Sequence, residues 1–418
     1  MSRLDRPDRA SHAEHDAPLI VHSHLRWDFV WQRPQQILSR MAASAPVLFV
    51  EEPIYLDDIA SPRLEVTTPT RNVHRAVPHL PATLRDTGDH AIAATRTLVR
   101  QLVGRGGPLA AQFASPVQWF YTPMPAPLML GSFDERGVVY DCMDELSKFR
   151  FAPPQLVERE RQLVTASDVV FTGGYRLYQA KSRLHPNVHF FGCGVDSAHF
   201  AKARLSDTPT PADLADVQGP IAGFYGVIDE RIDYELIATL AQARPEWTIA
   251  MAGPVVKVDP RDLPQAPNLR WLGQKQYAEL PAYAKAFDVC LMPFALNEAT
   301  EFINPTKTLE YMAAGKPIVS TAVADVVRNF TPIVSVARTH DGFVAAVRHA
   351  IACPDAALIA RGIGMAKDAS WEAIVGKMRA HLAQATTRRT ERRAVRETWT
   401  AVGALGAARD TGSEELTA

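Results

Sequence analysis

A lysine and a glutamate stand three residues apart in the segment NPTKTLEYMAAGKPIVST, which begins at Asn304. The pattern predicts a helix with Asn304 as its N-cap, Pro305 in the first helical position and Gly315 at its end. Lys307 then lies in the first turn, where the positive helix terminus disfavours a cation unless an anion binds there. A diphosphate would be held by the positive helix terminus and by Lys307 together, and Glu310 could accept hydrogen bonds from ribose hydroxyls. The alternative is an exposed Lys307–Glu310 ion pair.

A second cation at a helix start is expected in the first half of the chain. Arg33 and Pro34 open a predicted helix that follows the strand LIVHSH. Two such helix ends facing one cleft suit an anionic ligand bound between them. Nearby, Trp27 could stack on an acceptor molecule, with packing against the sheet edge as the alternative. Asp28 is a further acidic candidate for the same cleft.

Two aspartates close an apolar strand in the segment GVVYDCMDELSKF, which begins at Gly137. Acids at the carboxyl end of a parallel strand lie at the crevice where α/β proteins bind ligands. A carboxylate there could accept the proton of an attacking hydroxyl, and we expect Asp144 to do so with Asp141 beside it. Like charge from Asp141 and Glu145 would raise the pKa of Asp144. The alternative is a loop carboxylate that caps a helix.

The elements that must position these residues follow an α/β pattern. Apolar runs rich in Val, Ile and Phe alternate with amphipathic stretches, which is typical of parallel sheets covered by helices. A proline-rich stretch from Ser206 interrupts the pattern, so two α/β halves are expected. The strand candidates begin at Pro18, Pro46, Val117, Gly137, Asp168 and Val188 in the first half, and at Pro220, Trp247, Asn268, Val289, Lys316 and Thr331 in the second.

Composition excludes several classes of protein. The 418 residues carry a formal net charge of -1, which gives no electrostatic signature for nucleic acid. The four cysteines form no CxxC pair, so neither a zinc site nor a disulfide framework is indicated. No apolar run is long enough to cross a bilayer, and the N-terminus lacks the apolar core of a signal peptide. We therefore expect a cytoplasmic protein.

The segment LEYMAAGKPIVST resembles the nucleotide-binding signature of GT-B glycosyltransferases of the family-4 kind, in which a glutamate matching Glu310 binds the ribose. That family has a second glutamate eight positions earlier, where this chain has Phe302. The Asn-Pro-Thr-Lys run, which includes Thr306, is similar to a subgroup of bacterial glycosyltransferases that assemble surface polysaccharides of the teichuronic acid type. The resemblance implies two Rossmann-like domains facing a central cleft, with a C-terminal helix crossing back to the first.

The resemblance extends to two loops of the second half. GFYGVIDERIDYEL resembles the family's glycine-rich turn, whose glycine and basic residue meet the diphosphate and match Gly226 and Arg231. In PNLRWLGQKQYAEL, Gly273 and Gln274 fall where the family holds the nucleotide base. For Asp144 the placement is similar to that of the catalytic aspartate in inverting GT-B enzymes. The resemblance also implies chemistry without a bound metal or cofactor, because cations and helix dipoles take the charge of the leaving diphosphate.

The expected partners are a UDP- or GDP-sugar donor and a glycan or lipid-linked acceptor. The basic, partly apolar stretch from Ala91 would allow peripheral contact with the inner face of a membrane, with a packed surface helix as the alternative. Two other functions stay open: a nucleotide-sugar epimerase of similar fold, and a catalytically inactive nucleotide-sugar-binding scaffold. A pyridoxal phosphate-dependent phosphorylase is disfavoured because the chain is short.

Composition predicts a disordered lead (1–16) and a loose tail (386–418). The resemblance implies an acceptor domain (17–204), a donor domain (205–369) and a crossover helix (370–385).

Overall fold

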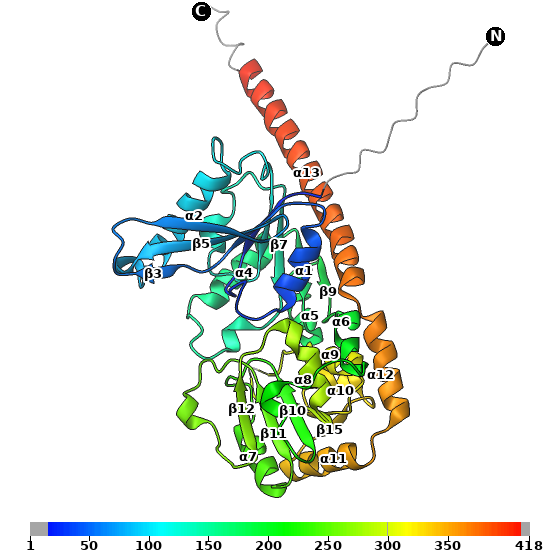
Figure 1. Ribbon diagram of the computed structural model, residues 1–418. Helices are drawn as coiled ribbons and strands as arrows, with labels where there is room; N and C mark the ends of the chain where they lie inside the picture. Colours follow the sequence, from blue (N-terminus) through cyan, green and yellow to red (C-terminus); the bar gives the residue numbers. More distant parts are fainter. Residues whose placement is uncertain (1–15, 299, 411–418) are drawn as a thin grey trace, which may run out of the picture.

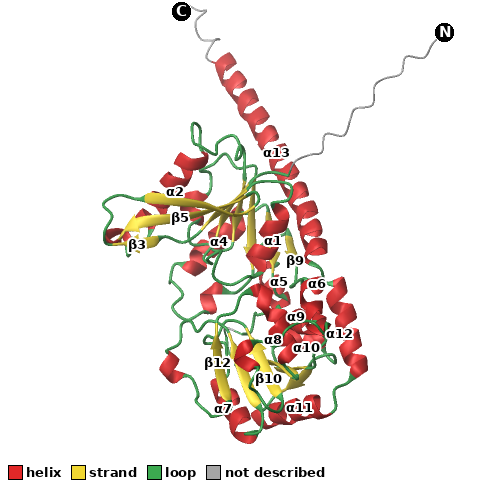
Figure 2. Ribbon diagram, in the orientation of Figure 1, coloured by secondary structure: helices red, strands yellow, loops and turns green. Residues whose placement is uncertain are grey.

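The computed structural model describes residues 16–298 and 300–410, and it contains two mainly parallel sheets, each flanked by helices (Figures 1 and 2). The first sheet has nine strands in the order β3-β5-β2-β1-β6-β7-β8-β9, and β4 pairs only with β5. All its pairings are parallel except β4 with β5. The strands are β1 (Leu19–His22), β2 (Val47–Val50), β3 (Ile54–Leu56), β4 (Arg63–Thr70), β5 (Val73–Pro81), β6 (Val117–Phe120), β7 (Gly137–Cys142), β8 (Val169–Thr172) and β9 (Val188–Phe190).

The second sheet has six strands in the order β12-β11-β10-β13-β14-β15, all parallel. Its order reverses at β10, which creates the crevice where open α/β sheets bind ligands. All six strands predicted for this half are present. They are β10 (Ile221–Tyr225), β11 (Thr248–Ala252), β12 (Leu269–Gly273), β13 (Val289–Met292), β14 (Ile318–Thr321) and β15 (Ser335–Ala337).

Three strands of the first sheet escaped the sequence analysis. β3, β4 and β5 form an extension at one side of the sheet, visible at the left of Figure 1. β4 is exposed along most of its length and contains a proline, so it lacks the apolar run that marks a buried strand. Such edge strands carry little hydrophobic signal in their sequence.

Alternation along β1 explains how the first sheet is covered. Leu19 and Val21 pack with the helices α1 and α13, whereas Ile20 packs with Val99 and Val103 of α2 on the other face. This is the two-residue period of a strand buried on both sides. The helices are α1 (Arg33–Met41), α2 (Asp89–Val103), α3 (Ala126–Met129), α4 (Leu156–Ala166), α5 (Tyr175–Lys181), α6 (Ser197–Ala201), α7 (Tyr234–Ala243), α8 (Leu280–Ala286), α9 (Lys307–Ala313), α10 (Ala324–Phe330), α11 (His340–Ala352), α12 (Ala356–Asp368) and α13 (Trp371–Asp410).

The last helix returns to the first half of the chain, as expected. Trp371, Met378 and Leu382 of α13 are buried in the core that contains β1 and α1. The expectation of a loose chain from residue 386 is wrong as far as Asp410, because α13 continues without a break. Arg389 fixes part of this continuation through a 2.9 Å ion pair with Asp168. Residues 1–15 and 411–418 lie outside the described part, and the other domain limits stay predictions.

Candidate active site

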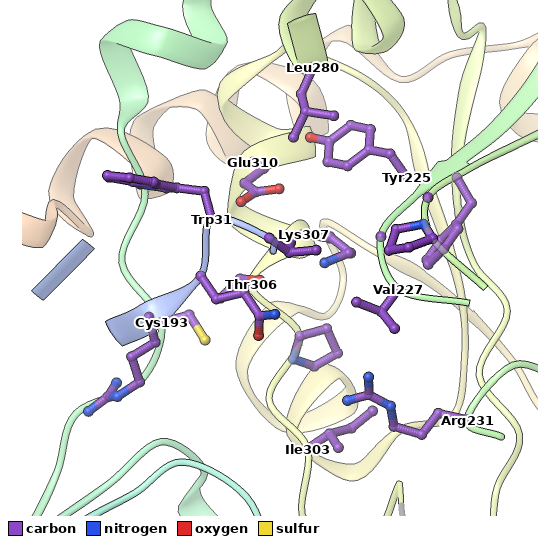
Figure 3. A pocket seen from close by; sticks show the side chains of 18 of the residues that line it. Trp31, Cys193, Tyr225, Val227, Arg231, Leu280, Ile303, Thr306, Lys307 and Glu310 are labelled. Atoms are coloured by element: carbon purple, nitrogen blue, oxygen red, sulfur yellow. The ribbon is translucent and has the colours of Figure 1, made fainter. Parts of the chain in front are cut away.

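The carboxyl ends of the two sheets enclose a pocket of about 170 Å³. Its first wall comes from residues 30–33 and from the loops that follow β7 and β8. Its second wall comes from the loops after β10, β11 and β13 and from α9 (Figure 3). Hydrogen bonds cross between the walls: Asn304 Nδ2 donates to the Gly173 carbonyl at 3.1 Å, and the Gln274 amide donates to the Phe29 carbonyl. The pocket, called the cleft pocket below, is therefore built from both halves of the chain.

The helix that carries the lysine starts later than predicted. α9 begins at Lys307, and its N-cap is Thr306, which makes no side-chain capping bond. Asn304 is not the cap, because its amide turns to the first domain, and its Oδ1 is buried without a hydrogen-bond partner among the described residues. Pro305 precedes the helix instead of occupying its first turn. With only seven residues, α9 has a weak N-terminal field, so an anion there would depend mainly on side-chain charge.

Lys307 projects into the cleft pocket without a counter-ion in contact. It forms no hydrogen bond or salt bridge with any described residue, and Figure 3 shows its ammonium among the pocket side chains. Burial lowers the pKa of Lys307, and the Glu310 carboxylate in the neighbourhood acts in the opposite direction. A half-buried ammonium with no bonded partner carries a positive charge that an anionic ligand can bind.

Two glycines shape the backbone around this lysine. A Cβ at Gly226 would lie 2.0 Å from Lys307 Cε, so only glycine lets the lysine side chain cross the end of β10. A Cβ at Gly253 would lie 1.7 Å from the Gly226 carbonyl oxygen, so the loops after β10 and β11 pack backbone to backbone. The sequence analysis identified Gly226 but missed Gly253, whose only signal is a glycine at the end of a predicted strand.

Glu310 lies one turn along α9 and also lines the cleft pocket. Burial raises the pKa of Glu310, and the Lys307 cation opposes that shift. The hydroxyl of Tyr225 lies on the same side of the pocket, near enough to the Glu310 carboxylate to oppose the rise in its pKa (Figure 3). Together, the carboxylate and the hydroxyl offer acceptors and a donor that suit the hydroxyl groups of a sugar or ribose.

Arg231 brings a second cation to the cleft pocket. Its Nε and Nη2 bind the Asp229 carboxylate at 2.9 Å and 2.7 Å, which fixes the plane of the guanidinium. The guanidinium also lies over the ring of Phe149 from the first domain, 5.5 Å from its centroid. Nη1 makes no hydrogen bond within the described residues, so one edge of the guanidinium stays available to a ligand.

The two residues expected at the nucleotide base separate in the structure. Gln274 lines the cleft pocket and bridges the domains through Phe29. Gly273 lies just outside the lining, where its carbonyl accepts the Gly253 amide at 2.8 Å and its φ is +69°. Gly273 therefore shapes the loop through its backbone, and of the two residues only Gln274 lines the cleft pocket.

Asp144 lies on the first-domain wall of the cleft pocket, across from Arg231. Burial raises the pKa of Asp144, Arg231 opposes the shift, and Asp229 adds to it. The expectation that Asp141 and Glu145 cause this shift is wrong. Glu145 is paired with Lys181 at 2.8 Å, away from Asp144.

Asp141 and Arg33 pair with each other, so Arg33 lines the cleft pocket with a guanidinium that is already bonded within the first domain. Arg33 donates from Nε and Nη2 to the Asp141 carboxylate, at 3.1 Å and 2.9 Å, and from Nη1 to the Phe191 carbonyl at 2.8 Å. The side chains are 5% and 0% exposed. The predicted catalytic role of Asp141 and the predicted anion-binding role of Arg33 are corrected accordingly, because a buried bidentate pair has no free charge to offer.

The aromatic wall of the first domain also differs from the prediction. Trp27 is only 4% exposed and packs edge-on against Phe49, so it belongs to the core. Asp28 is not among the residues that line the cleft pocket, and it forms an ion pair with Arg75 at 3.1 Å. Trp31 lines the pocket instead and approaches Tyr277 of the second domain, with ring centroids 6.1 Å apart.

The described residues hold no group of three or more His, Cys, Asp or Glu side chains arranged to bind a metal ion. Within the same residues, no single helix is long and apolar enough to cross a membrane. Helices α11 and α12 reach that length and apolar composition only when they are taken together, and the chain bends by 97° between them.

Comparison with known proteins agrees with this geometry. Residues 220–353, which contain β10 to β15, match the family model described as glycosyl transferases group 1. A curated relative from Bacillus subtilis (strain 168), named as the teichuronic acid biosynthesis glycosyltransferase TuaH, is 27% identical over 221 residues. That alignment covers 48% of this chain and 54% of the relative, so it spans about half the length of each.

Solved structures resemble the chain over most of its length. A sucrose-phosphate synthase from Thermosynechococcus elongatus superimposes with a TM-score of 0.65 at 16% identity, covering 88% of this chain and 98% of that one. An E. coli trehalose-6-phosphate structure bound with UDP-2-fluoro glucose gives 0.65 at 14% identity, covering 88% and 99%. The solved structures show that the chain has the two-domain GT-B fold, and residues 220–353 within it match the group 1 glycosyl transferase model.

Proposed function

We propose that the protein binds a UDP- or GDP-linked sugar in the cleft pocket and transfers the sugar to a hydroxyl group of an acceptor. The observation that carries the proposal is the half-buried Lys307 ammonium, which lines the pocket without a bonded counter-ion. Arg231 presents a second cation with its Nη1 edge unoccupied. A diphosphate carries the charge that this pair lacks, and charge-assisted hydrogen bonds to it are among the stronger polar contacts.

The remaining pocket residues fit the other parts of such a donor. Glu310 would accept hydrogen bonds from the ribose hydroxyls, and the Gln274 amide would meet the base. Gly226 and Gly253 keep the loops free of side chains that would displace Lys307. Thr306, Pro305 and Asn304 line the same wall and complete the donor side.

We further propose that Asp144 is the general base and that transfer inverts the anomeric centre. The acceptor oxygen forms a bond to the anomeric carbon while its proton passes to the Asp144 carboxylate. The bond from that carbon to the diphosphate oxygen breaks, and its electron pair leaves with the diphosphate, whose charge Lys307 and Arg231 stabilise. The support is the position of Asp144 on the wall opposite Arg231, with neither carboxylate oxygen bonded within the described residues.

A role in bacterial surface polysaccharide assembly is proposed from the similarity to the teichuronic acid biosynthesis protein. The acceptor would then be a glycan or a lipid-linked saccharide, and the enzyme would work in the cytoplasm, at the inner face of the membrane.

A panel of nucleotide sugars tests the proposal. A donor at 100 times its dissociation constant stabilises the folded protein by about 2.7 kcal/mol, so the matching donor should raise the melting temperature while others leave it unchanged. The donor that binds is then incubated with a lipid extract and with soluble glycans, and transfer is followed by mass spectrometry. Isomerisation of the donor without acceptor would indicate an epimerase. Binding without any transfer would indicate a scaffold, and no binding by any nucleotide sugar would contradict the proposal.

A further inference from the structure

A second cavity opens in the first domain, separate from the cleft pocket. Its volume is about 320 Å³, and it lies over the carboxyl ends of β2, β1 and β6, between the loop after β2 and helix α2. We call it the first-domain cavity. The side chains that form most of its wall are apolar: Val50, Pro53, Ala91, Ile92, Met124 and Met129.

The buried polar side chains in this wall have hydrogen-bond partners within the protein, whereas the charged groups of Glu52 and Arg85, which have none among the described residues, are exposed. The Glu51 carboxylate receives bonds from Arg26 at 3.0 Å and Arg75 at 2.8 Å. His22 is bonded to Gln118 at 3.0 Å, and burial lowers the pKa of His22 to about 4, so the ring is neutral at pH 7. A saccharide would need unpaired donors and acceptors in the buried interior of the cavity, whereas an apolar chain would not.

The cavity and the cleft pocket lie along the same edge of the first sheet. The strand order β2-β1-β6-β7-β8 puts the cavity and the Asp144 wall on one sheet edge, and β1 lies two strand spacings, about 10 Å, from β7. Two chain segments line both spaces. One contributes Ser23 to the cavity and Trp31 to the cleft pocket, and the other contributes Pro153 to the cavity and Asp144 to the cleft pocket.

We propose that the first-domain cavity holds the apolar chain of a lipid-linked acceptor, which places the reacting hydroxyl of that acceptor beside Asp144. The proposal rests on the glycosyl transfer proposed above, and it selects a lipid-linked acceptor over a free glycan. A chain seated over β1 and β2 would leave about two strand spacings for the polar head to reach the catalytic wall. Exposed Arg85, whose guanidinium lies 5.8 Å above the Tyr55 ring at the rim, would face the lipid phosphates of a membrane.

The test uses hexyl, octyl and decyl β-glucosides below their micellar concentrations, with methyl β-glucoside as the chainless control. Burial of each methylene should strengthen binding roughly fourfold, so calorimetric affinity should rise steeply along the series. Ile92→Trp, which fills the cavity from α2, should flatten this dependence. Met124→Gln keeps the side-chain length but adds a polar group, and it serves as the second variant if Ile92→Trp misfolds. Val157→Trp, on the exposed face of α4 outside the cavity, should leave the series unchanged.

Equal affinity along the series in the wild-type protein would overturn the proposal, and so would an unchanged series in both cavity variants. Saturable binding of methyl β-glucoside with the same affinity would indicate a free glycan instead. UDP and GDP are titrated into the same variants, where their affinity should not change. The glucosides contain no nucleotide, so a chain-length dependence without nucleotide binding would retain the cavity and reject the donor assignment.

Discussion

The starts of α1 and α9 look alike in sequence and differ in structure. Each has a proline within two residues of a cation, Arg33 in α1 and Lys307 in α9. Arg33 is bonded on both sides, to Asp141 and to a backbone carbonyl, and is 5% exposed. Lys307 has no bonded partner among the described residues and faces the cleft pocket.

The difference lies in a residue that the local motif does not contain. Asp141 is 108 residues from Arg33 in the chain and reaches it only because β7 ends beside the start of α1. Among the described residues no carboxylate comes into contact with Lys307 in the same way, although Glu310 lies near enough to influence its pKa. A cation at a helix start thus indicates an anion site only when the fold brings no counter-ion to it.

Exchange of Asp144 for asparagine should have the largest effect. Asp144→Asn keeps the side-chain shape but removes the proton acceptor, so turnover should fall roughly 10²–10⁴-fold while donor affinity barely changes. Burial raises the pKa of Asp144. As the pH is lowered, the carboxylate should therefore become protonated, and the wild-type rate should begin to fall, at a pH above the ordinary aspartate range. The variant should lose this acidic limb. Retention of configuration in the product, by NMR, or near-normal turnover would refute the assignment.

Removal of Arg33 should affect stability and leave the donor site intact. Arg33→Met leaves the fully buried Asp141 without its partner, which costs about 3–5 kcal/mol. For a domain of this size the melting temperature should fall by about 6–20 °C. The double variant Arg33→Met/Asp141→Leu should recover much of the loss, because no unpaired charge remains. An anion-binding role for Arg33 would instead weaken nucleotide binding with little change in melting temperature.

Lys307→Ala tests the other half of the comparison. We expect UDP or GDP binding to weaken by about 1–3 kcal/mol, the scale of a lost charge-assisted hydrogen bond, measured by calorimetry. Lys275→Ala is the matched control, because Lys275 lines the same pocket but is paired with Asp213 at 2.7 Å. Equal affinities for wild type and the Lys307 variant would remove this lysine from the donor site.

The sequence predicts those features that depend on residues close together in the chain, such as strands and helix ends. Alternation and apolar runs predicted both sheets, and Gly315, with a φ of +72°, does follow the end of α9. The exposed strand β4 has no apolar run, so its pairing with β5 could not be predicted. The Arg33–Asp141 pair and the burial of Trp27 depend on contacts between distant segments, which spacing along the chain does not encode.

Glu310→Gln should have a smaller effect than loss of the lysine. Glutamine is a comparable helix former and keeps a hydrogen-bond acceptor, so only the charge on the acceptor is lost. Nucleotide affinity should fall by about 1 kcal/mol, the difference between a charged and a neutral hydrogen bond. The melting temperature without ligand should stay close to that of the wild type. Intact affinity together with impaired folding would make Glu310 a structural residue.

Removal of metal ions by a chelator should leave the rate of sugar transfer unchanged. The donor diphosphate would meet Lys307 and Arg231, which supply the positive charge that a metal ion supplies elsewhere. The carboxylates near them are poor candidates for a cation site, since Asp141 is held by Arg33 and Asp229 is held by Arg231. Transfer measured in EDTA should therefore equal transfer in Mg²⁺ at the same ionic strength, for the wild type and for Arg33→Met alike. An absolute requirement for Mg²⁺ or Mn²⁺ would mean that Lys307 and Arg231 do not suffice, and Asp144 and Asp229 would become the candidate ligands.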